Sequence, residues 1–251
     1  MKVVLVTGGA RGLGEAAARA MAARGWIVAV ADRNAAGAEA VAAACPGGFA
    51  VPVDLATDAG PAAMVRSAAE RAGRLDGLVN GAAFAPVEPF VEMTAQAWTA
   101  ALAVNVRAVA LATAAAAREM AKTGGGRIVN VTSAAARMAL PNYAAYAATK
   151  AAVDSITRSA AVALAPLGVR VNSISPGMMD TPLQLDGEAE MARLEGRNDL
   201  ERFRAERTQR IPLARRTTPE EMAAMVVWLL CDAPDYMTAE RLNVTGGLDK
   251  D

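Results

Sequence analysis

The sequence predicts one α/β domain over residues 1–251, a doubly wound, parallel sheet of seven strands with helices on both faces. Short β-branched runs alternate with long alanine-rich stretches, which is typical of βαβ crossovers. The strand runs are almost entirely apolar, as strands buried on both faces must be. With 53% hydrophobic and 21% charged residues, the chain can also bury a large core.

The expected elements follow one another in a regular order. The strands cover Lys2–Val6, Ile27–Ala31, Phe49–Val53, Gly77–Asn80, Arg127–Val131, Arg170–Ile174 and Arg241–Val244. The helices lie between them, over Gly12–Arg24, Ala35–Ala44, Pro61–Ala72, Ala95–Lys122, Tyr143–Ala165 and Pro219–Leu230. Because parallel neighbours need long crossovers, this alternation favours a parallel sheet in which each crossover is a helix.

One segment, residues 178–212, departs from this order. It is rich in Glu, Arg, Asp and Gln, and it lies between the sixth strand and the last long helix. Insertions of this length are usually surface lids or disordered loops. We expect a helical, substrate-binding lid within the same domain, with most of its charges on a solvated face. Apolar residues that would line a pocket beneath it are Phe84, Pro86, Met138, Met178 and Met179.

The composition excludes several classes of protein. The 26 basic and 26 acidic residues balance, which argues against nucleic-acid binding, and the absence of His excludes histidine triads and histidine metal ligands. The two cysteines, Cys45 and Cys231, lack the spacing of a zinc site, so we expect buried thiols and no metal. No signal-peptide pattern and no run of about 18 apolar residues is found, so a cytoplasmic protein is expected.

The first expected strand runs directly into a glycine-rich turn, residues 7–14, and a helix follows at once. Glycines let the backbone turn tightly and approach a pyrophosphate, and the helix N-terminus offers it free N–H groups. A glycine motif in this strand–turn–helix context indicates a dinucleotide site rather than a simple tight turn. The predicted contacts in this turn are Gly8, Arg11, Gly12, Leu13 and Gly14.

Asp32 ends the second expected strand, where an acidic residue is placed to bind the adenosine ribose hydroxyls. Its charge would repel a 2′-phosphate by roughly 4 kcal/mol at about 4 Å and an effective dielectric of about 20. Arg11 and Arg33 would offset part of this repulsion by pairing with the phosphate. We therefore expect NAD, with NADP as the alternative; an N-cap of the next helix is the other role open to Asp32.

Asp54 and Leu55 follow the third expected strand, at the edge of the sheet where open α/β folds bind ligands. Contact with the adenine is one interpretation of Asp54, and a simple Asx turn is the other.

Ser133, Tyr146 and Lys150 form the candidate catalytic group. Tyr146 and Lys150 are four residues apart on one expected helix, so both side chains leave the same face. A cation beside a phenol lowers its pKa and makes it a usable acid or base. Ser133 ends the preceding strand and could hold a substrate oxygen. Tyr143 is a nearby decoy, because the residue four positions later is Ala147.

With these motifs the chain resembles the short-chain dehydrogenase/reductase family over essentially its full length. The family's glycine turn matches residues 7–14, and its Tyr-xxx-Lys pair matches Tyr146 and Lys150. Its Ser, thirteen residues before the Tyr, matches Ser133. Further matches are Asn105 with Val106, Pro176-Gly177 with Thr181, and the closing segment at 242–247. The resemblance implies a Rossmann fold and a homotetramer.

The resemblance also implies roles for individual residues. Tyr146 would exchange the proton with the substrate oxygen, and Ser133 would orient and polarise the carbonyl. Lys150 would bind the nicotinamide ribose and depress the pKa of Tyr146. Asn105 would hold a water that relays protons to Lys150. The remaining implied cofactor contacts are Asn80, Gly81 and Ala82 after the fourth strand, and Pro176, Gly177, Met179 and Thr181 after the sixth.

The sequence departs from the family pattern after the fourth strand, where Asn-Asn-Ala-Gly is replaced by Asn80-Gly81-Ala82-Ala83. The closing Val244-Thr245-Gly246-Gly247 is similar to polyol-type members. We expect reversible hydride transfer between NAD and a secondary alcohol or ketone, first of all a polyol or sugar. The alternatives are a 3-oxoacyl thioester reductase that uses NADPH and, in another class, an inactive dinucleotide-binding regulator.

Overall fold

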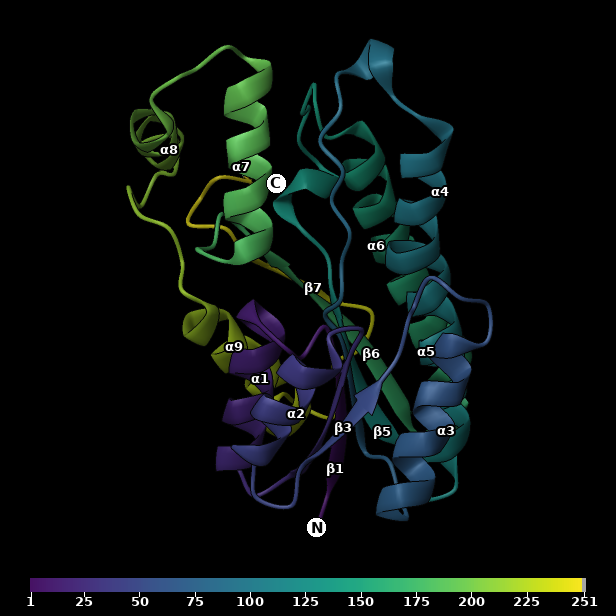
Figure 1. The fold of residues 1–251 in the computed structure, drawn as a ribbon. Coiled ribbons are helices and arrows are strands. Elements are labelled where there is room, and N and C mark those ends of the chain that lie inside the picture. Colours follow the sequence, from purple (N-terminus) through teal and green to yellow (C-terminus); the bar gives the residue numbers. More distant parts are fainter. Residues whose placement is uncertain (250–251) are drawn as a thin grey trace.

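A seven-stranded parallel sheet runs through the centre of the protein, between two layers of helices (Figure 1). The structure is a computed structural model that describes residues 1–249; residues 250–251 of the expected domain lie outside the described part. The strands are β1 Val3–Thr7, β2 Ile27–Asp32, β3 Phe49–Pro52, β4 Gly77–Asn80, β5 Gly126–Val131, β6 Val169–Pro176 and β7 Arg241–Val244. Their order is β3-β2-β1-β4-β5-β6-β7 with every pair parallel, which confirms the predicted sheet.

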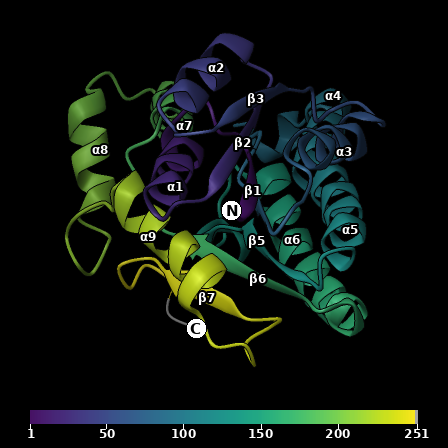
Figure 2. The ribbon, with the colours of Figure 1, turned by 90° about the horizontal axis from the view of Figure 1, so that it is seen from below.

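Helices cover both faces of the sheet, as Figure 2 shows in the view along it. On one face lie α1 Gly12–Ala23, α2 Ala35–Ala43 and α9 Pro219–Val227; on the other lie α3 Gly60–Ala72, α4 Ala95–Leu102, α5 Ala108–Ala121 and α6 Ala144–Leu164. Two apolar clusters fill the two sheet–helix interfaces, because β-branched strand residues alternate between the faces. In β1, Val4 and Val6 face α1, and Val3 and Leu5 face the α3 and α5 side.

The strand order reverses direction at β1. Strands β2 and β3 extend from one side of β1, while β4 to β7 extend from the other. Open α/β sheets bind ligands at the carboxyl ends of the strands beside such a switch point. At this point Thr7, the last residue of β1, connects β1 to the chain after β4. Its Oγ1 accepts the backbone N–H groups of Gly81 at 3.0 Å and Ala82 at 3.2 Å.

The long helix predicted over residues 95–122 is interrupted. A π-helical segment, Ala103–Arg107, separates α4 from α5, and a second one, Trp228–Asp232, follows α9. Neither contains Pro or Gly, so the apolar pattern carries no mark of the extra residue. The continuous stretch Ala95–Ala121 is long and apolar enough to span a membrane by length and composition. However, 56% of an apolar 18-residue part of it is buried inside the protein.

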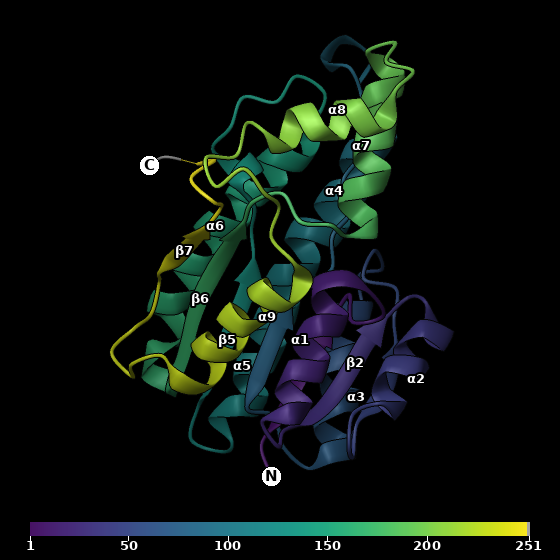
Figure 3. The same cartoon turned by 90° about the vertical axis from the view of Figure 1, so that its left-hand side faces the viewer.

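The segment at 178–212 folds into two helices, α7 Pro182–Leu194 and α8 Leu200–Thr208, which stand above the carboxyl edge of the sheet (Figure 3). Thr181 caps α7 by accepting the N–H of Gln184, and Pro182 occupies the first turn, where its missing N–H costs nothing. Met191, Ala192 and Phe203 form a small apolar core between the two helices. The segment is therefore helical, as predicted, and its role as a lid stays a prediction.

Candidate active site

A cleft of about 490 Å³ opens at the switch point, between the carboxyl ends of the strands and the helices α7 and α8. This volume lies in the range of small-molecule sites. The predicted site residues that line it are Gly8, Arg11, Gly12, Leu13, Gly14, Asp32, Arg33, Asp54, Leu55, Gly81, Ala82, Ser133, Tyr146, Lys150, Pro176, Gly177, Met179 and Thr181. Phe84, Met138 and Met178 of the expected apolar wall also line it, and Pro86 does not.

The glycine turn forms a cradle that only glycine allows. A Cβ atom on Gly14 would lie 2.1 Å from the carbonyl oxygen of Gly8, and Gly8 itself has a φ of +67°. The first residue before α1, Arg11, provides no side-chain cap, so the N–H groups of the first turn are not taken by a capping side chain. Such a helix end, with its positive dipole, suits an anionic group such as a pyrophosphate.

Asp32 lies at the end of β2 and braces the glycine turn. Its Oδ2 accepts the N–H of Ala10 at 3.2 Å, and its Oδ1 accepts the N–H of Asn34 at 2.9 Å. The N-cap of α2 is Asn34, which accepts the N–H of Gly37, so the capping role considered for Asp32 is wrong. The Asp32 carboxylate therefore stands in the cleft as a fixed negative charge.

Asp54 makes the Asx turn that the sequence allows, because its Oδ1 accepts the N–H of Ala56 at 2.9 Å. Its side chain is exposed at the rim of the cleft, next to Leu55, so the turn and a contact with a ligand are compatible.

Two predicted residues do not line the cleft. Asn80 is buried between β4 and β5, where its Nδ2 donates to Asn130 Oδ1 at 2.9 Å and to Thr113 Oγ1 at 3.2 Å. The Asn80 side chain thus has a structural role between β4 and β5, and the cofactor contact at this position stays a prediction.

Asn105 lies in the π-helical segment and is 0% exposed. Its Oδ1 accepts the N–H of Phe84 at 2.8 Å, and its Nδ2 donates to the carbonyl of Phe84 at 2.7 Å and to Thr149 Oγ1 at 2.9 Å. Both donor hydrogens are therefore used by the protein. In the structure Asn105 fixes the loop after β4 against α6. Its partner in α6 is Thr149, the residue directly before Lys150.

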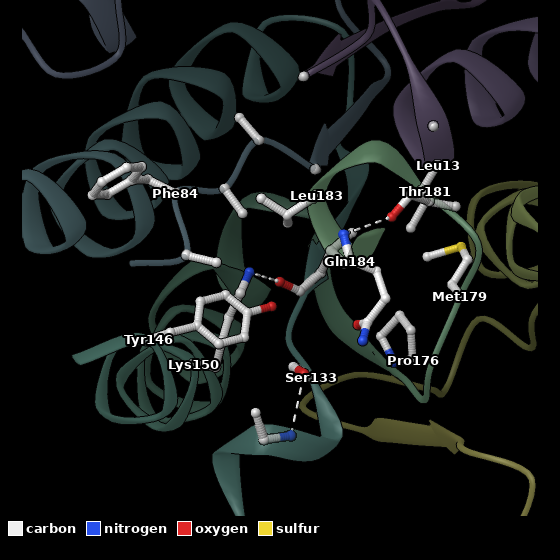
Figure 4. Close-up of a pocket in the computed structure, with 18 of the residues that line it drawn as sticks. Leu13, Phe84, Ser133, Tyr146, Lys150, Pro176, Met179, Thr181, Leu183 and Gln184 are labelled. Atoms are coloured by element: carbon white, nitrogen blue, oxygen red, sulfur yellow. Dashed lines mark hydrogen bonds between the residues drawn. The ribbon is translucent and has the colours of Figure 1, made fainter. Parts of the chain in front are cut away.

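Tyr146, Lys150 and Ser133 come together in the cleft, and Figure 4 shows their side chains gathered beside one another. The Nζ of Lys150 lies 5.6 Å from the ring centroid of Tyr146 and donates to the carbonyl oxygen of Val131 at 2.7 Å. Ser133 Oγ accepts the N–H of Ala135 at 3.1 Å, which fixes its direction. The four-residue helix spacing and the strand end thus bring the three side chains to one cleft, and their catalytic roles stay a prediction.

Burial dominates the acid–base properties of this group. It raises the pKa of Tyr146 to about 12, and the hydrogen bond with Ser133 acts in the opposite direction. Burial also lowers the pKa of Lys150 to about 8, against an opposing effect of Asp154. Desolvation of the phenolate therefore raises the pKa of Tyr146, opposite to the depression by Lys150 that the sequence predicted.

The sequence interpretation missed Tyr143 and the lid residues of the cleft. Tyr143, dismissed as a decoy, packs edge-on against Tyr146 with ring centroids 5.5 Å apart. The lid contributes Leu183, Gln184 and Arg207 among others. No local pattern marked Tyr143 as a cleft residue, and none distinguishes Arg207 from its exposed neighbours.

The chain between β6 and α7 closes the cleft on the side opposite Tyr146. Gly177 packs so tightly on the last turn that a Cβ atom there would lie 2.9 Å from Thr245 Cα. Thr181 lies beside the glycine turn, since a Cβ on Gly12 would be 3.3 Å from its methyl carbon. Within residues 1–249, no group of three or more Cys, Asp or Glu side chains is arranged to hold a metal ion.

Comparison with known proteins agrees with this geometry. Residues 8–249 match the family model described as enoyl-(acyl carrier protein) reductase. The chain is 37% identical to D-threitol dehydrogenase of Mycolicibacterium smegmatis, over 98% of this chain and 92% of that protein. It is 37% identical to cis-4-hydroxycyclohexanecarboxylate dehydrogenase of Sinomonas cyclohexanicum, over 98% and 96%.

A solved structure gives the same result. The 3-ketoacyl-(acyl-carrier-protein) reductase of Brucella melitensis, in complex with NADH, superposes with a TM-score of 0.87 at 31% identity, over 99% of this chain and 98% of that one. The chain belongs to the short-chain dehydrogenase/reductase family, and it is an oxidoreductase that acts on alcohol groups.

Proposed function

We propose that this protein is an NAD-dependent dehydrogenase that oxidises a secondary alcohol of a polyol or sugar to the ketone, and catalyses the reverse reaction. The observation that carries the proposal is the convergence of Tyr146, Lys150 and Ser133 in the same cleft as the glycine turn. Relatives with equal identity act on D-threitol and on a hydroxycyclohexanecarboxylate, which supports a hydroxylated substrate.

A nicotinamide cofactor, when bound, supplies the hydride acceptor for the alcohol carbon. The glycine cradle and the uncapped start of α1 fit its pyrophosphate, and residues 176–181 would hold its carboxamide end. Asp32 would hold the adenosine ribose, as the sequence indicates. Its negative charge supports NAD over NADP, although the exposed Arg11 and Arg33 beside it would favour a phosphate.

The protein's own residues would manage the proton. In its phenolate form, Tyr146 takes the proton of the substrate hydroxyl as the carbonyl forms, and in the reverse reaction the phenol returns that proton to the carbonyl oxygen. Ser133 holds the same oxygen in place. Lys150, with a pKa of about 8, is a proton-exchanging group near neutral pH one helical turn from the phenol. Asn105 holds the Phe84 loop against Thr149 of α6, the residue next to Lys150, so it would act as a positioning residue.

The segment at 178–212 would act as the substrate-binding lid of a single domain. Leu183 and Gln184 of α7 line the cleft, and Figure 4 places them across from Tyr146. A mixed apolar and polar lining of this kind suits a substrate with both a carbon frame and several hydroxyl groups.

A homotetramer is the proposed assembly. Apolar side chains remain exposed on the outer helices: Leu102 of α4 at 44%, Leu111 of α5 at 39% and Val162 of α6 at 75%. Alanine-rich faces on α5 and α6 allow another helix to approach closely. Sedimentation of the purified protein measures the assembly directly.

The reaction is tested by supplying a panel of polyols and sugars with NAD and following absorbance at 340 nm. Turnover of at least one secondary alcohol with NAD is expected. Reduction of 3-oxoacyl thioesters with NADPH, and no polyol turnover, would favour the thioester reductase. NAD binding without turnover of any alcohol or ketone would favour the inactive regulator.

A further inference from the structure

A buried carboxylate in the lid is surrounded by arginines. Glu188 of α7 is 0% exposed, and its Oε1 accepts hydrogen bonds from Gln184 at 3.0 Å and from Arg207 Nε at 3.0 Å. Arg216 donates to both carboxylate oxygens, from Nη1 at 2.9 Å and from Nη2 at 3.1 Å. Arg204 Nε lies a further 3.7 Å from Oε2. One carboxylate therefore faces three guanidinium groups.

The positive charge around Glu188 exceeds the negative charge. Asp180 pairs with Arg216 at 3.1 Å, but its side chain is 61% exposed and the pair is screened by solvent. The other nearby lid carboxylates, Glu190 and Glu206, pair with arginines other than these three. The cluster thus keeps a net positive charge that an anion can balance.

Arg207 is the member of the cluster that faces the cleft. Its Nε is held by Glu188, whereas its two terminal amino groups have no hydrogen-bond acceptor among the residues that the structure describes. Its side chain is 16% exposed, so most of it is shielded from bulk solvent. Arg210 lies beside it in the cleft lining, and within residues 1–249 its side chain has no ion-pair partner.

Arg207 lies away from the glycine turn, because it is held by Glu188, which is further along α7. Thr181, at the start of α7, lies beside Gly12, and Glu188 lies six residues after Pro182, which corresponds to about 9 Å along the helix.

Gly187, next to Glu188, instead contacts Tyr143: a Cβ atom there would lie 2.1 Å from the Tyr143 hydroxyl. Tyr143 in turn packs on Tyr146. Arg207 therefore belongs to the substrate end of the cleft, on the side of the two tyrosines.

We propose that the substrate of this dehydrogenase carries a carboxylate, at the end remote from the reacting carbinol, and that Arg207 binds it with support from Arg210 at the entrance. The inference rests on the proposed function and narrows its substrate class from hydroxylated compounds in general to those that also carry a carboxylate. Here Glu188 acts as a positioning residue, since it fixes the Nε edge of Arg207 and leaves the terminal edge free.

The chemistry of the guanidinium favours a carboxylate. Two parallel N–H groups match the two oxygens of one carboxylate, and the pairing strengthens in a cleft that excludes much of the water. A neutral alcohol would leave these donors unpaired when it fills the cleft, and unpaired buried donors are a strong source of discrimination between substrates.

The proposal is tested with matched pairs of alcohols and NAD, with kcat/KM measured at 340 nm. One pair is D-threonate and D-threitol, and the other is 4-hydroxycyclohexanecarboxylate and 4-methylcyclohexanol. In each pair the members differ at the carboxylate. We expect kcat/KM to be at least about tenfold higher for the anionic member of at least one pair, which corresponds to about 1.4 kcal/mol. Higher kcat/KM for the neutral member of both pairs would overturn the inference and leave the proposed function standing.

Variants locate the effect. In Arg207→Met the ratio of anionic to neutral kcat/KM should fall to near one, mainly through KM of the anionic substrate. Arg193→Met is the matched control, because Arg193 is an exposed lid arginine that pairs only with Glu190, and its ratio should equal that of the wild type. Arg210→Met, which removes no side-chain hydrogen bond or ion pair within residues 1–249, should lower the ratio by a smaller factor and guards against misfolding of Arg207→Met. An unchanged ratio in both Arg207→Met and Arg210→Met would contradict the proposal.

A binding measurement separates this inference from the proposed reaction. Cyclohexanecarboxylate, which has no hydroxyl group, is titrated calorimetrically into the NAD-loaded protein. Binding that weakens at least tenfold in Arg207→Met supports the anion site even if none of the four alcohols is oxidised. Absence of binding to the wild type, or equal binding to both proteins, overturns it.

Discussion

The ring of Tyr143 stands edge-on to the ring of Tyr146, with centroids 5.5 Å apart and an interplanar angle of 83°. Edge-to-face contacts of this kind stabilise the relative orientation of two rings. The hydroxyl of Tyr143 reaches the lid at Gly187, so one side chain connects the candidate proton-exchanging residue to the segment above it. The residue at position 187 of the lid should therefore affect the orientation of the Tyr146 ring through Tyr143.

Gly187→Ala tests this coupling. The new methyl carbon would lie 2.1 Å from the Tyr143 hydroxyl, so the ring must move, and kcat/KM for the alcohol should fall by about tenfold or more. The unfolding free energy should change little, because the higher helix propensity of alanine offsets part of the cost of moving the ring. The double variant Gly187→Ala/Tyr143→Phe removes the clashing oxygen, and its methyl carbon lies an ordinary 3.4 Å from the ring. Its kcat/KM should return to that of Tyr143→Phe; failure of this rescue would refute the contact.

Asp32→Asn tests the electrostatic choice of cofactor. Asparagine keeps an acceptor oxygen for one of the two N–H groups that Asp32 binds but loses the charge, so the ratio of kcat/KM with NADP to that with NAD should rise by about tenfold or more. The effect should shrink at high salt. Asp58→Asn, an exposed carboxylate outside the cleft, serves as the control and should leave the ratio unaltered. Equal ratios for wild type and Asp32→Asn would show that the charge does not select the cofactor.

The unfolding free energy of the protein should depend on pH in a way that shows the lowered pKa of the buried Lys150. Its pKa is lowered from 10.5 to about 8 by burial, so between these values the unfolded chain binds a proton that the folded protein does not. Stability therefore rises with pH across this window, and it is lost as pH falls toward 8.

Relative to Lys150→Met, the wild type should gain about 2 kcal/mol of unfolding free energy between pH 8 and pH 10, and nothing between pH 6 and pH 7. Urea unfolding of both proteins at each pH measures the difference. Parallel curves for the two proteins over pH 8 to 10 would show that Lys150 titrates normally.

The elements that form the sheet and the residues that face the cleft from strand ends could be predicted from sequence. Apolar runs fix the buried strands. Because the carboxyl ends of parallel strands meet at one edge of the sheet, this pattern alone places Asp32 and Ser133 at the same edge. The four-residue spacing of Tyr146 and Lys150 needs only the helix period.

Other features depend on tertiary packing. Asn80 ends a strand like Asp32, but its side chain points into the core toward Asn130, and the strand pattern alone does not tell which way a terminal residue faces. Arg207 lines the cleft only because α8 packs on α7 through Phe203 and Met191. The pKa of Tyr146 likewise follows from how deeply the fold buries the ring, which no spacing encodes.

Tyr146→Phe is the sharpest test that Tyr146 exchanges the substrate proton. The variant removes one oxygen atom, so turnover with NAD is expected to fall by about 10²–10⁴. The circular dichroism spectrum and the Kd for NAD should stay within about twofold of the wild type, since the ring and its packing on Tyr143 remain. Turnover near that of the wild type would contradict the assignment of Tyr146 as the group that exchanges the substrate proton.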